Sequence, residues 1–146
     1  MNTHEIPAET AFRPTAALLP GLRMGIDITQ ISAIAASVDS FGERFMQRLF
    51  SDDEVAYATQ VPAQTAQRLA ARFAAKEAAI KAFDLSEAGI GWRDIEVIRG
   101  TDGACSLALH RRAAALVAQS GCTQIAVSLS HEGDYATAVV AAIDPR

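Results

Sequence analysis

The sequence predicts an α+β fold, a mainly antiparallel sheet with helices packed on one of its faces. Three patterns lead to this prediction. Short segments near both ends of the domain alternate apolar and other residues, as strands do. A long alanine-rich segment in the middle has the spacing of a helix. The later strands come in pairs joined by short turns, which favours antiparallel pairing.

The length of 146 residues and an apolar content of 50% indicate one domain with a core of its own. Residues 1–20 carry three prolines and no periodicity, so we expect an irregular N-terminal extension before a single domain over residues 21–146. A net charge of -4 argues against a general nucleic-acid binder. No apolar run reaches the roughly 18–20 residues of a membrane span, and no signal peptide is recognisable. We therefore expect a cytoplasmic protein whose partners include neither nucleic acid nor membrane.

The first predicted strand runs from Leu22 to Ile31. Its apolar residues Met24, Ile26 and Ile28 share one face, and Asp27 lies on the other. An aspartate is disfavoured inside a strand, and a buried carboxylate needs a partner. Asp27 therefore either faces solvent on a wet side of the sheet or binds a metal or substrate.

Two helical segments follow. Residues 32–50 have helical spacing with a break near residues 40–42. Ser51 and Glu54 then have the spacing of a capping box, which predicts a further short helix that Pro62 ends.

The longest predicted helix spans Gln64 to Phe83, without an internal glycine or proline. Five residues of this segment recur at spacings of three and four and therefore form a stripe along one face of the helix: Leu69, Phe73, Lys76, Ile80 and Phe83. All of them except the lysine are apolar. Glu77 lies beside this stripe, at the border of the buried face, and Lys81 follows one turn later. Such a pair is either an ordinary exposed ion pair or part of a cleft.

The remainder is predicted as a loop, a hairpin, a helix and a second hairpin. The ranges are 84–91 for the loop, Trp92–Ile98 and Cys105–Leu109 for the first pair of strands, His110–Ser120 for the helix, and Gln124–Leu129 and Tyr135–Ile143 for the last pair. Residues 130–134 are predicted as a tight turn that contains Ser130 and His131. His131 is either solvated there or available to bind phosphate or move a proton.

The polar residues suit a magnesium–phosphate site. Mg²⁺ prefers oxygen ligands and is held by one or two carboxylates plus substrate phosphates, a role open to Asp27 and Glu77. Lys81 and Arg72 can neutralise charge that develops on a phosphate. No P-loop, dinucleotide-binding, zinc-protease or nucleophile-elbow motif is present, which argues against an ATPase of the usual type.

Three motifs in order resemble those of the 4'-phosphopantetheinyl transferases. GIDI at residues 25–28 resembles the first family motif. RFAAKEAAIKAF at residues 72–83 is similar to the central signature, in which KEA-x-x-K recurs. SLSHE at residues 128–132, followed by Tyr135, is similar to the last motif of the short holo-acyl-carrier-protein synthase branch.

The resemblance implies transfer of phosphopantetheine from coenzyme A to a serine of an apo acyl carrier protein, with release of adenosine 3',5'-bisphosphate. Asp27 and Glu77 would hold Mg²⁺, and Lys81 would stabilise the leaving phosphate. Glu77, or a water on the metal, would help remove the serine proton. Coenzyme A contacts would come from Arg72, Lys81, Ser130 and His131. The family fold has a long central helix on the sheet, and the short branch forms homotrimers with sites between subunits, although the residues alone leave a monomer open.

A basic surface for an acidic carrier helix is expected at Arg44, Phe45 and Arg48. Three segments depart from the family pattern: residues 84–86 replace a glycine-rich loop, residues 32–34 lack a basic residue, and residues 102–104 replace a Gly-Lys-Pro turn. These departures favour a dedicated carrier from a specialised pathway over the general fatty-acid carrier.

Two other functions share the same site. A trimeric relative could bind coenzyme A or a carrier without turnover. A magnesium-dependent phosphohydrolase would use water in place of the carrier serine, and would release adenosine 3',5'-bisphosphate with no carrier present.

Overall fold

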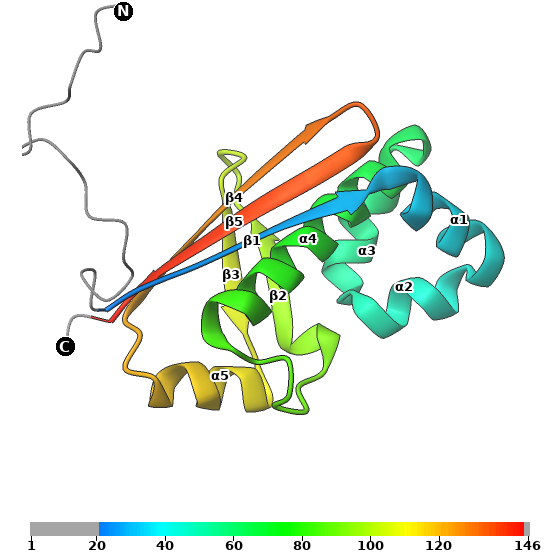
Figure 1. Cartoon of the computed structure of the whole chain (residues 1–146). Helices are drawn as coiled ribbons and strands as arrows, with labels where there is room; N and C mark the ends of the chain where they lie inside the picture. Colours follow the sequence, from blue (N-terminus) through cyan, green and yellow to red (C-terminus); the bar gives the residue numbers. More distant parts are fainter. Residues whose placement is uncertain (1–20, 145–146) are drawn as a thin grey trace, which may run out of the picture.

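Two antiparallel sheets and a set of helices make up the computed structural model, which describes residues 21–144. The elements are β1 (Leu22–Gln30), α1 (Ile31–Phe41), α2 (Glu43–Leu49), α3 (Asp52–Thr59), the 3₁₀ turn η3 (Pro62–Gln64), α4 (Thr65–Phe83), the 3₁₀ turn η4 (Trp92–Asp94), β2 (Ile95–Arg99), β3 (Cys105–Leu109), α5 (Arg111–Gln119), β4 (Gln124–Glu132) and β5 (Tyr135–Ile143) (Figure 1). The predicted extension over residues 1–20 lies outside the described residues. Within those described, no helix has the length and apolar character needed to cross a membrane.

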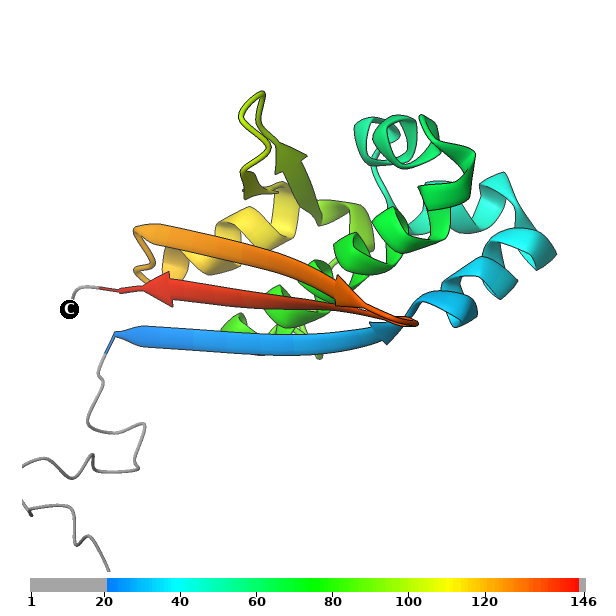
Figure 2. The same cartoon turned by 90° about the horizontal axis from the view of Figure 1, so that it is seen from above.

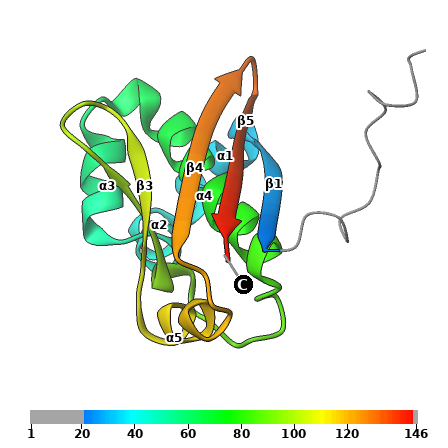
Figure 3. The same cartoon turned by 90° about the vertical axis from the view of Figure 1, so that its left-hand side faces the viewer.

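The larger sheet has the strand order β1-β5-β4, and both pairings are antiparallel. Its helices lie on one face, as Figure 2 shows, which confirms the predicted α+β layering. The hairpin β2–β3 forms a separate two-stranded sheet. Figure 3 shows β3 running beside β4 without joining its sheet.

Helix α4 lies directly under β1 and β5, and its alanines allow a close approach. Ala74, Ala75, Ala78 and Ala79 are fully buried. Gly25 of β1 crosses the helix so closely that a Cβ atom there would lie 1.9 Å from the carbonyl oxygen of Ala78. A glycine is required at this position because no side chain fits between strand and helix.

The close contact decides which face of β1 points inward. Only the face with Gly25 and Asp27 fits against the helix, so the large apolar residues Met24, Ile26 and Ile28 point outward with 62–65% of their surface exposed. The predicted parity of the strand is confirmed. The interpretation of Asp27 as a solvent-facing residue is wrong, because its side chain is on the helix side and only 17% exposed.

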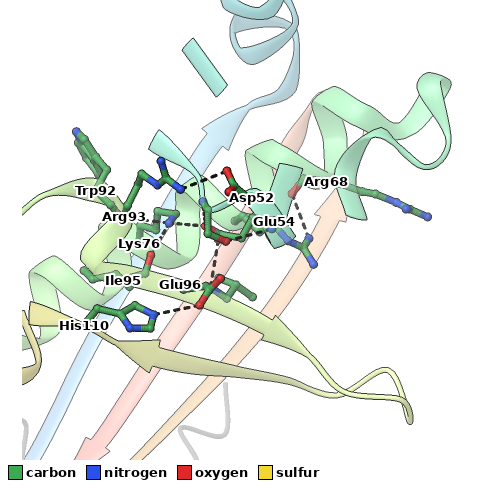
Figure 4. Close-up of polar contacts among 12 residues, drawn as sticks. Asp52, Glu54, Arg68, Lys76, Trp92, Arg93, Ile95, Glu96 and His110 are labelled. Atoms are coloured by element: carbon green, nitrogen blue, oxygen red, sulfur yellow. Dashed lines mark hydrogen bonds and ion pairs between the residues drawn. The ribbon is translucent and has the colours of Figure 1, made fainter. Parts of the chain in front are cut away.

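Lys76, which the sequence places on the apolar stripe of α4, forms a buried ion pair. Its Nζ atom lies 2.8 Å from Oε1 of Glu54, and both side chains are completely buried (Figure 4). Nζ also donates hydrogen bonds to the carbonyl oxygens of Trp92 and Ile95. Burial lowers the pKa of Lys76, and Glu54 opposes this shift.

Glu54 makes three further hydrogen bonds in the same network. It completes the predicted capping box of α3. The Glu54 carboxylate accepts a hydrogen bond from the Ser51 amide, and the Ser51 hydroxyl accepts one from the Glu54 amide. Its Oε2 atom accepts the Val97 amide at 3.1 Å. The pair Glu54–Lys76 therefore joins α3, α4, η4 and β2 at one point.

The other boundaries follow the sequence with two corrections. Residues 92–94 form a 3₁₀ turn and not the start of a strand. Ser130, His131 and Glu132 belong to β4, so the turn is only Gly133 and Asp134, a two-residue hairpin loop with a positive φ of 56° at the glycine. The break between the first two helices falls at Gly42, as predicted.

Removing one partner of the buried pair is expected to be far more damaging than removing both. Glu54→Gln or Lys76→Met leaves a buried charge uncompensated, and should lower the free energy of unfolding by about 3–5 kcal/mol. The measurement is urea unfolding followed by circular dichroism.

The double substitution Glu54→Gln with Lys76→Met is the control, because it removes both charges and keeps a side-chain oxygen at residue 54 for the Ser51 and Val97 amides. It should recover most of the loss. Equal losses in the single and double variants would contradict this account of the pair.

Candidate functional site

Asp27 is held at the middle of β1 by hydrogen bonds from three side chains. Lys81 of α4 places Nζ 3.1 Å from Oδ1, and it also donates to the carbonyl oxygen of Ile26 at 3.0 Å. Thr29 donates to Oδ2 at 3.2 Å, and Thr137 of β5 donates to the Asp27 carbonyl at 2.8 Å. The carboxylate is therefore oriented by Thr29 of the same strand and Lys81 of the helix, and Thr137 of the neighbouring strand holds the backbone carbonyl of Asp27.

Glu77 lies on the same side of α4 as Lys81, because four residues advance the helix by one turn. Partial burial raises the pKa of the Glu77 carboxyl, the nearby Asp27 carboxylate raises it further, and Lys81 offsets part of this rise. The two carboxylates thus repel each other at a site that is only partly open to water, and a cation placed between them would relieve the repulsion.

The donor set fits a magnesium ion. Residues 21–144 contain no group of three or more His, Cys, Asp or Glu side chains placed to hold a metal. Mg²⁺ does not require such a group, because it keeps several waters and binds one or two carboxylates together with substrate phosphates. Asp27 and Glu77 offer two carboxylates, and Lys81, whose side chain is 54% exposed, supplies a positive charge beside them.

Arg72 does not join this group within one chain. Five residues separate it from Glu77, which turns it about 140° around the helix axis. Its guanidinium instead lies 4.3 Å from the centre of the Tyr57 ring, on the side of α3 and β2. Only 4% of the residue surface is exposed.

Ser130 and His131 lie farther away, near the end of β4. Both are exposed, and His131 forms a hydrogen bond of 2.9 Å with Gln67 in the first turn of α4. Ten residues separate Gln67 from Glu77, or about 15 Å along the helix axis. Within one protomer the structure thus brings together Asp27, Glu77 and Lys81, and keeps Arg72, Ser130 and His131 apart from them.

The segment expected to bind a carrier forms a shallow groove over α1 and α2. Arg44 and Arg48 are exposed on one side of α2, and Phe45 is half-buried beneath them. Together with Ser40 and Phe41 they line a hollow of about 570 Å³. Phe41 exposes 66% of its surface, so the groove combines apolar and positive groups.

Residues 84–86, the departure from the glycine-rich loop, begin with a strained residue. Asp84 caps the C-terminus of α4 in the left-handed region, with φ 54° and ψ 46°. Glycine adopts this conformation without a steric cost, whereas aspartate tolerates it less well. The backbone therefore still makes the turn that a glycine would make, and the carboxylate of Asp84 points into solvent.

The sequence model of the 4'-phosphopantetheinyl transferase superfamily matches residues 23–140 of this chain. The chain belongs to this superfamily. Among similar proteins, the holo-[acyl-carrier-protein] synthase of Gloeobacter violaceus is 38% identical over 121 residues, which cover 83% of this chain and 92% of that protein. The holo-[acyl-carrier-protein] synthase of Nitratidesulfovibrio vulgaris (strain Hildenborough) is 46% identical over 119 residues, covering 80% and 94%.

Solved structures of superfamily members show the same fold. The ACPS–CoA complex of Chronobacterium ammoniagenes superposes with a TM-score of 0.75 at 31% identity, covering 86% of this chain and 98% of that one. The Helicobacter pylori holo-[acyl-carrier-protein] synthase in complex with coenzyme A gives a TM-score of 0.70 at 26% identity, covering 80% and 96%. The predicted family membership is confirmed.

Two supporting residues of this superfamily member were not singled out from the sequence. Thr29 and Thr137 orient Asp27 through side-chain and backbone contacts, and Thr137 lies 110 positions away in the chain. Thr29 shares the strand parity of Asp27 and could have been found by that signal. Thr137 could not, because nothing local links β5 to β1.

The raised pKa of Glu77 has a consequence for stability. A carboxyl whose pKa is raised by folding contributes stability that is full below its unfolded pKa and is lost as the pH rises through the folded pKa. At neutral pH without divalent ions, Glu77→Gln should therefore raise the free energy of unfolding. The gain should stay under about 1 kcal/mol, because the part of the carboxylate that is open to solvent screens the repulsion.

Urea unfolding of both proteins between about pH 4 and pH 8 provides the measurement. The difference in free energy of unfolding between Glu77→Gln and the wild type should shrink as the pH is lowered. Glu87→Gln, at an exposed glutamate on the following loop, is the matched control and should show no such trend. A Glu77→Gln protein that is less stable at neutral pH would contradict the proposed repulsion.

Proposed function

We propose that this protein transfers 4'-phosphopantetheine from coenzyme A to a serine of an apo acyl carrier protein, with the release of adenosine 3',5'-bisphosphate. It is a holo-[acyl-carrier-protein] synthase, a phosphopantetheinyl transferase, by its similarity to curated members over most of its length. The observation that carries the chemistry is the meeting of Asp27, Glu77 and Lys81 between β1 and α4.

The reaction replaces the phosphoanhydride bond of coenzyme A by a phosphate ester bond to serine. The serine oxygen attacks the β-phosphorus of coenzyme A, and the bond from that phosphorus to the oxygen of the leaving bisphosphate breaks. The serine proton leaves, and Glu77, beside Asp27 and Lys81, is the carboxylate that we assign to accept it. Lys81 can turn its exposed ammonium from Asp27 towards a phosphate oxygen and stabilise the leaving group.

Asp27 and Glu77 are the residues that would hold Mg²⁺. Bound there, the ion would neutralise charge on the pyrophosphate of coenzyme A. Asp27 suits this role because Thr29 and Lys81 fix its carboxylate in place before any ligand arrives.

A homotrimer would unite the separated residues. The outer face of the large sheet carries an apolar strip, and monomeric proteins rarely expose an apolar patch of this kind. The strip consists of five residues that are each 41–65% exposed: Leu22, Met24, Ile26, Ile28 and Ile143. Packing this face against other copies would bury it. Arg72, Ser130 and His131 of one subunit would then serve the coenzyme A bound at Asp27 and Glu77 of the next.

The groove over α1 and α2 suits the carrier protein. Arg44 and Arg48 would pair with an acidic helix, and Phe45 would provide apolar contact. Helix α1 carries no basic residue, so fewer charges steer the carrier than the family pattern would supply. This supports a dedicated carrier over the general fatty-acid carrier.

The first test is intact-mass spectrometry of an apo carrier incubated with the enzyme, coenzyme A and Mg²⁺. The carrier should gain one phosphopantetheine. Glu77→Gln and Asp27→Asn should each reduce the rate by at least about 100-fold, in line with losses of preorganised charge stabilisation. The gain should also disappear when a chelator removes Mg²⁺.

The matched control is again Glu87→Gln, which should retain the wild-type rate. Release of adenosine 3',5'-bisphosphate without a carrier would instead identify a phosphohydrolase. Carrier binding with coenzyme A left intact, across fatty-acid and specialised carriers, would identify a binding module.

The proposed trimer can be tested by measuring the molecular mass in solution before and after substitutions on the exposed face of β1. The wild-type protein should have three times the mass of one 15.5 kDa chain in light scattering. Ile26→Glu with Ile28→Glu places charges on the apolar strip, so it should give monomers that remain folded but have lost transfer activity. Active monomers would contradict a shared site.

A further inference from the structure

The turn between β4 and β5 binds the start of the helix that follows β1, as Figure 2 shows. Its residue Asp134 accepts hydrogen bonds from the first two amides of α1. The Asp134 carbonyl oxygen accepts the Ile31 amide at 2.7 Å, and Oδ1 accepts the Ser32 amide at 2.9 Å. The Ser32 hydroxyl donates to Oδ2. One residue, 102 positions beyond Ser32, therefore caps the helix.

Helix α1 has no cap from its own segment of the chain. Its N-cap residue Gln30 makes no capping hydrogen bond with its side chain, and its first turn contains no acidic residue. The first amides of a helix have no partner within the helix, and a negative charge near them is favourable. Asp134 provides both the acceptors and the charge. Its hydrogen bonds with Ser32 lower the pKa of the Asp134 carboxyl, which is therefore ionised at neutral pH.

The sheet holds Asp134 in a defined place. The turn has only two residues, and Tyr135 directly after it pairs with Glu132 of β4 and with Gln30 of β1. All three strands of the large sheet therefore end at this turn. An aspartate in a turn usually binds amides of its own turn, whereas both carboxylate oxygens of Asp134 bind Ser32. The sheet thus fixes the point from which α1 begins.

The direction of α1 matters because this helix connects the carboxylate site with the carrier groove. Strand β1 passes directly into α1, and three residues separate Asp27 from Ile31. The far end of α1 contributes Ser40 and Phe41 to the groove. Among the eleven residues of α1, Ile34 alone is buried, so packing holds this helix weakly. The contacts at its start therefore carry much of its orientation.

We propose that Asp134 is a positioning residue for the carrier protein, because its contacts with Ser32 hold α1 in the orientation that binds the carrier. This inference rests on the proposed function and on carrier docking over α1 and α2. Asp134 itself touches neither substrate. Because the carrier binds only molecules whose α1 is in place, loss of Asp134 lowers the apparent affinity for the carrier and not the rate at saturation.

The test compares Asp134→Ala, which removes both carboxylate oxygens, with Asp134→Asn, which keeps one acceptor for the Ser32 amide. Calorimetric titration with an apo carrier gives Kd, and transfer assays give KM for the carrier and for coenzyme A. Asp134→Ala should raise Kd and KM for the carrier about fivefold, the effect of losing one helix cap. Asp134→Asn should stay within about twofold of the wild type, because asparagine caps nearly as well as aspartate. KM for coenzyme A and kcat should not change in either variant.

A double substitution tests the contact between the two residues. Ser32→Ala removes the hydroxyl and should raise KM for the carrier by itself, but it should add nothing in Asp134→Ala. An effect of Ser32→Ala that persists in full in Asp134→Ala would overturn the assignment, because the hydroxyl would then act without Asp134. Glu87→Gln, which removes an exposed carboxylate from another loop, is the matched control and should keep the wild-type values.

Two results would overturn the role of Asp134. Unchanged Kd and KM for the carrier in Asp134→Ala would mean that α1 keeps its orientation without the cap. An equal rise in KM for coenzyme A would mean a general loss of structure. The proposed function fails by a different result, a wild type that transfers no phosphopantetheine. The carrier titration still tests Asp134 in that case, and a wild type that binds no carrier overturns its role as well.

Discussion

The structure depends on a buried ion pair between Glu54 and Lys76. Apolar surfaces alone could pack α3, α4 and the β2–β3 hairpin in several nearby arrangements. The lysine ammonium has to satisfy two backbone carbonyls and one carboxylate at once, and the carboxylate has to accept a strand amide as well. The observed arrangement of the four elements meets all these requirements at once, so the pair favours this geometry over packings that would leave a buried charge without its partners.

Lys76 and Glu77 are adjacent in sequence, and they connect opposite halves of the molecule. Neighbouring helix positions point about 100° apart, so one residue faces α3 and β2 while the other faces β1. The same helix therefore fixes the carboxylate site on one side and the contact of Arg72 with the Tyr57 ring on the other. Any shift of α4 along its axis would alter both together.

Local patterns predicted much of this fold. The capping box at Ser51, the break at Gly42 and the alternation in β1 are short-range signals, and the structure confirms them. The boundary errors have local causes too. Residues 92–94 look like the start of a strand because the alternating apolar residues Ile95 and Val97 follow them. Local hydrogen bonds between Gly91 and Asp94 close a 3₁₀ turn there instead.

Tertiary arrangements were harder to predict. Periodicity places Lys76 on the apolar stripe but cannot supply the carboxylate that allows its burial. Motif and chemistry were enough to group Asp27, Glu77 and Lys81. That these side chains lie together could be seen only from the way β1 packs on α4. The position of Arg72 on the far side of the helix follows from simple helix geometry, but what it would face required the fold.

The sheet order has a consequence for how the protein is made. The first strand pairs along its whole length with the last, and Asp27 is oriented by Thr137, 110 positions later. During synthesis β1 leaves the ribosome long before β5 exists, so α4 and the hairpin can form while the first strand waits without its partner. The apolar residues of β1 are exposed throughout this interval. Loss of the last ten residues would leave a chain with most of its helices and no assembled carboxylate site.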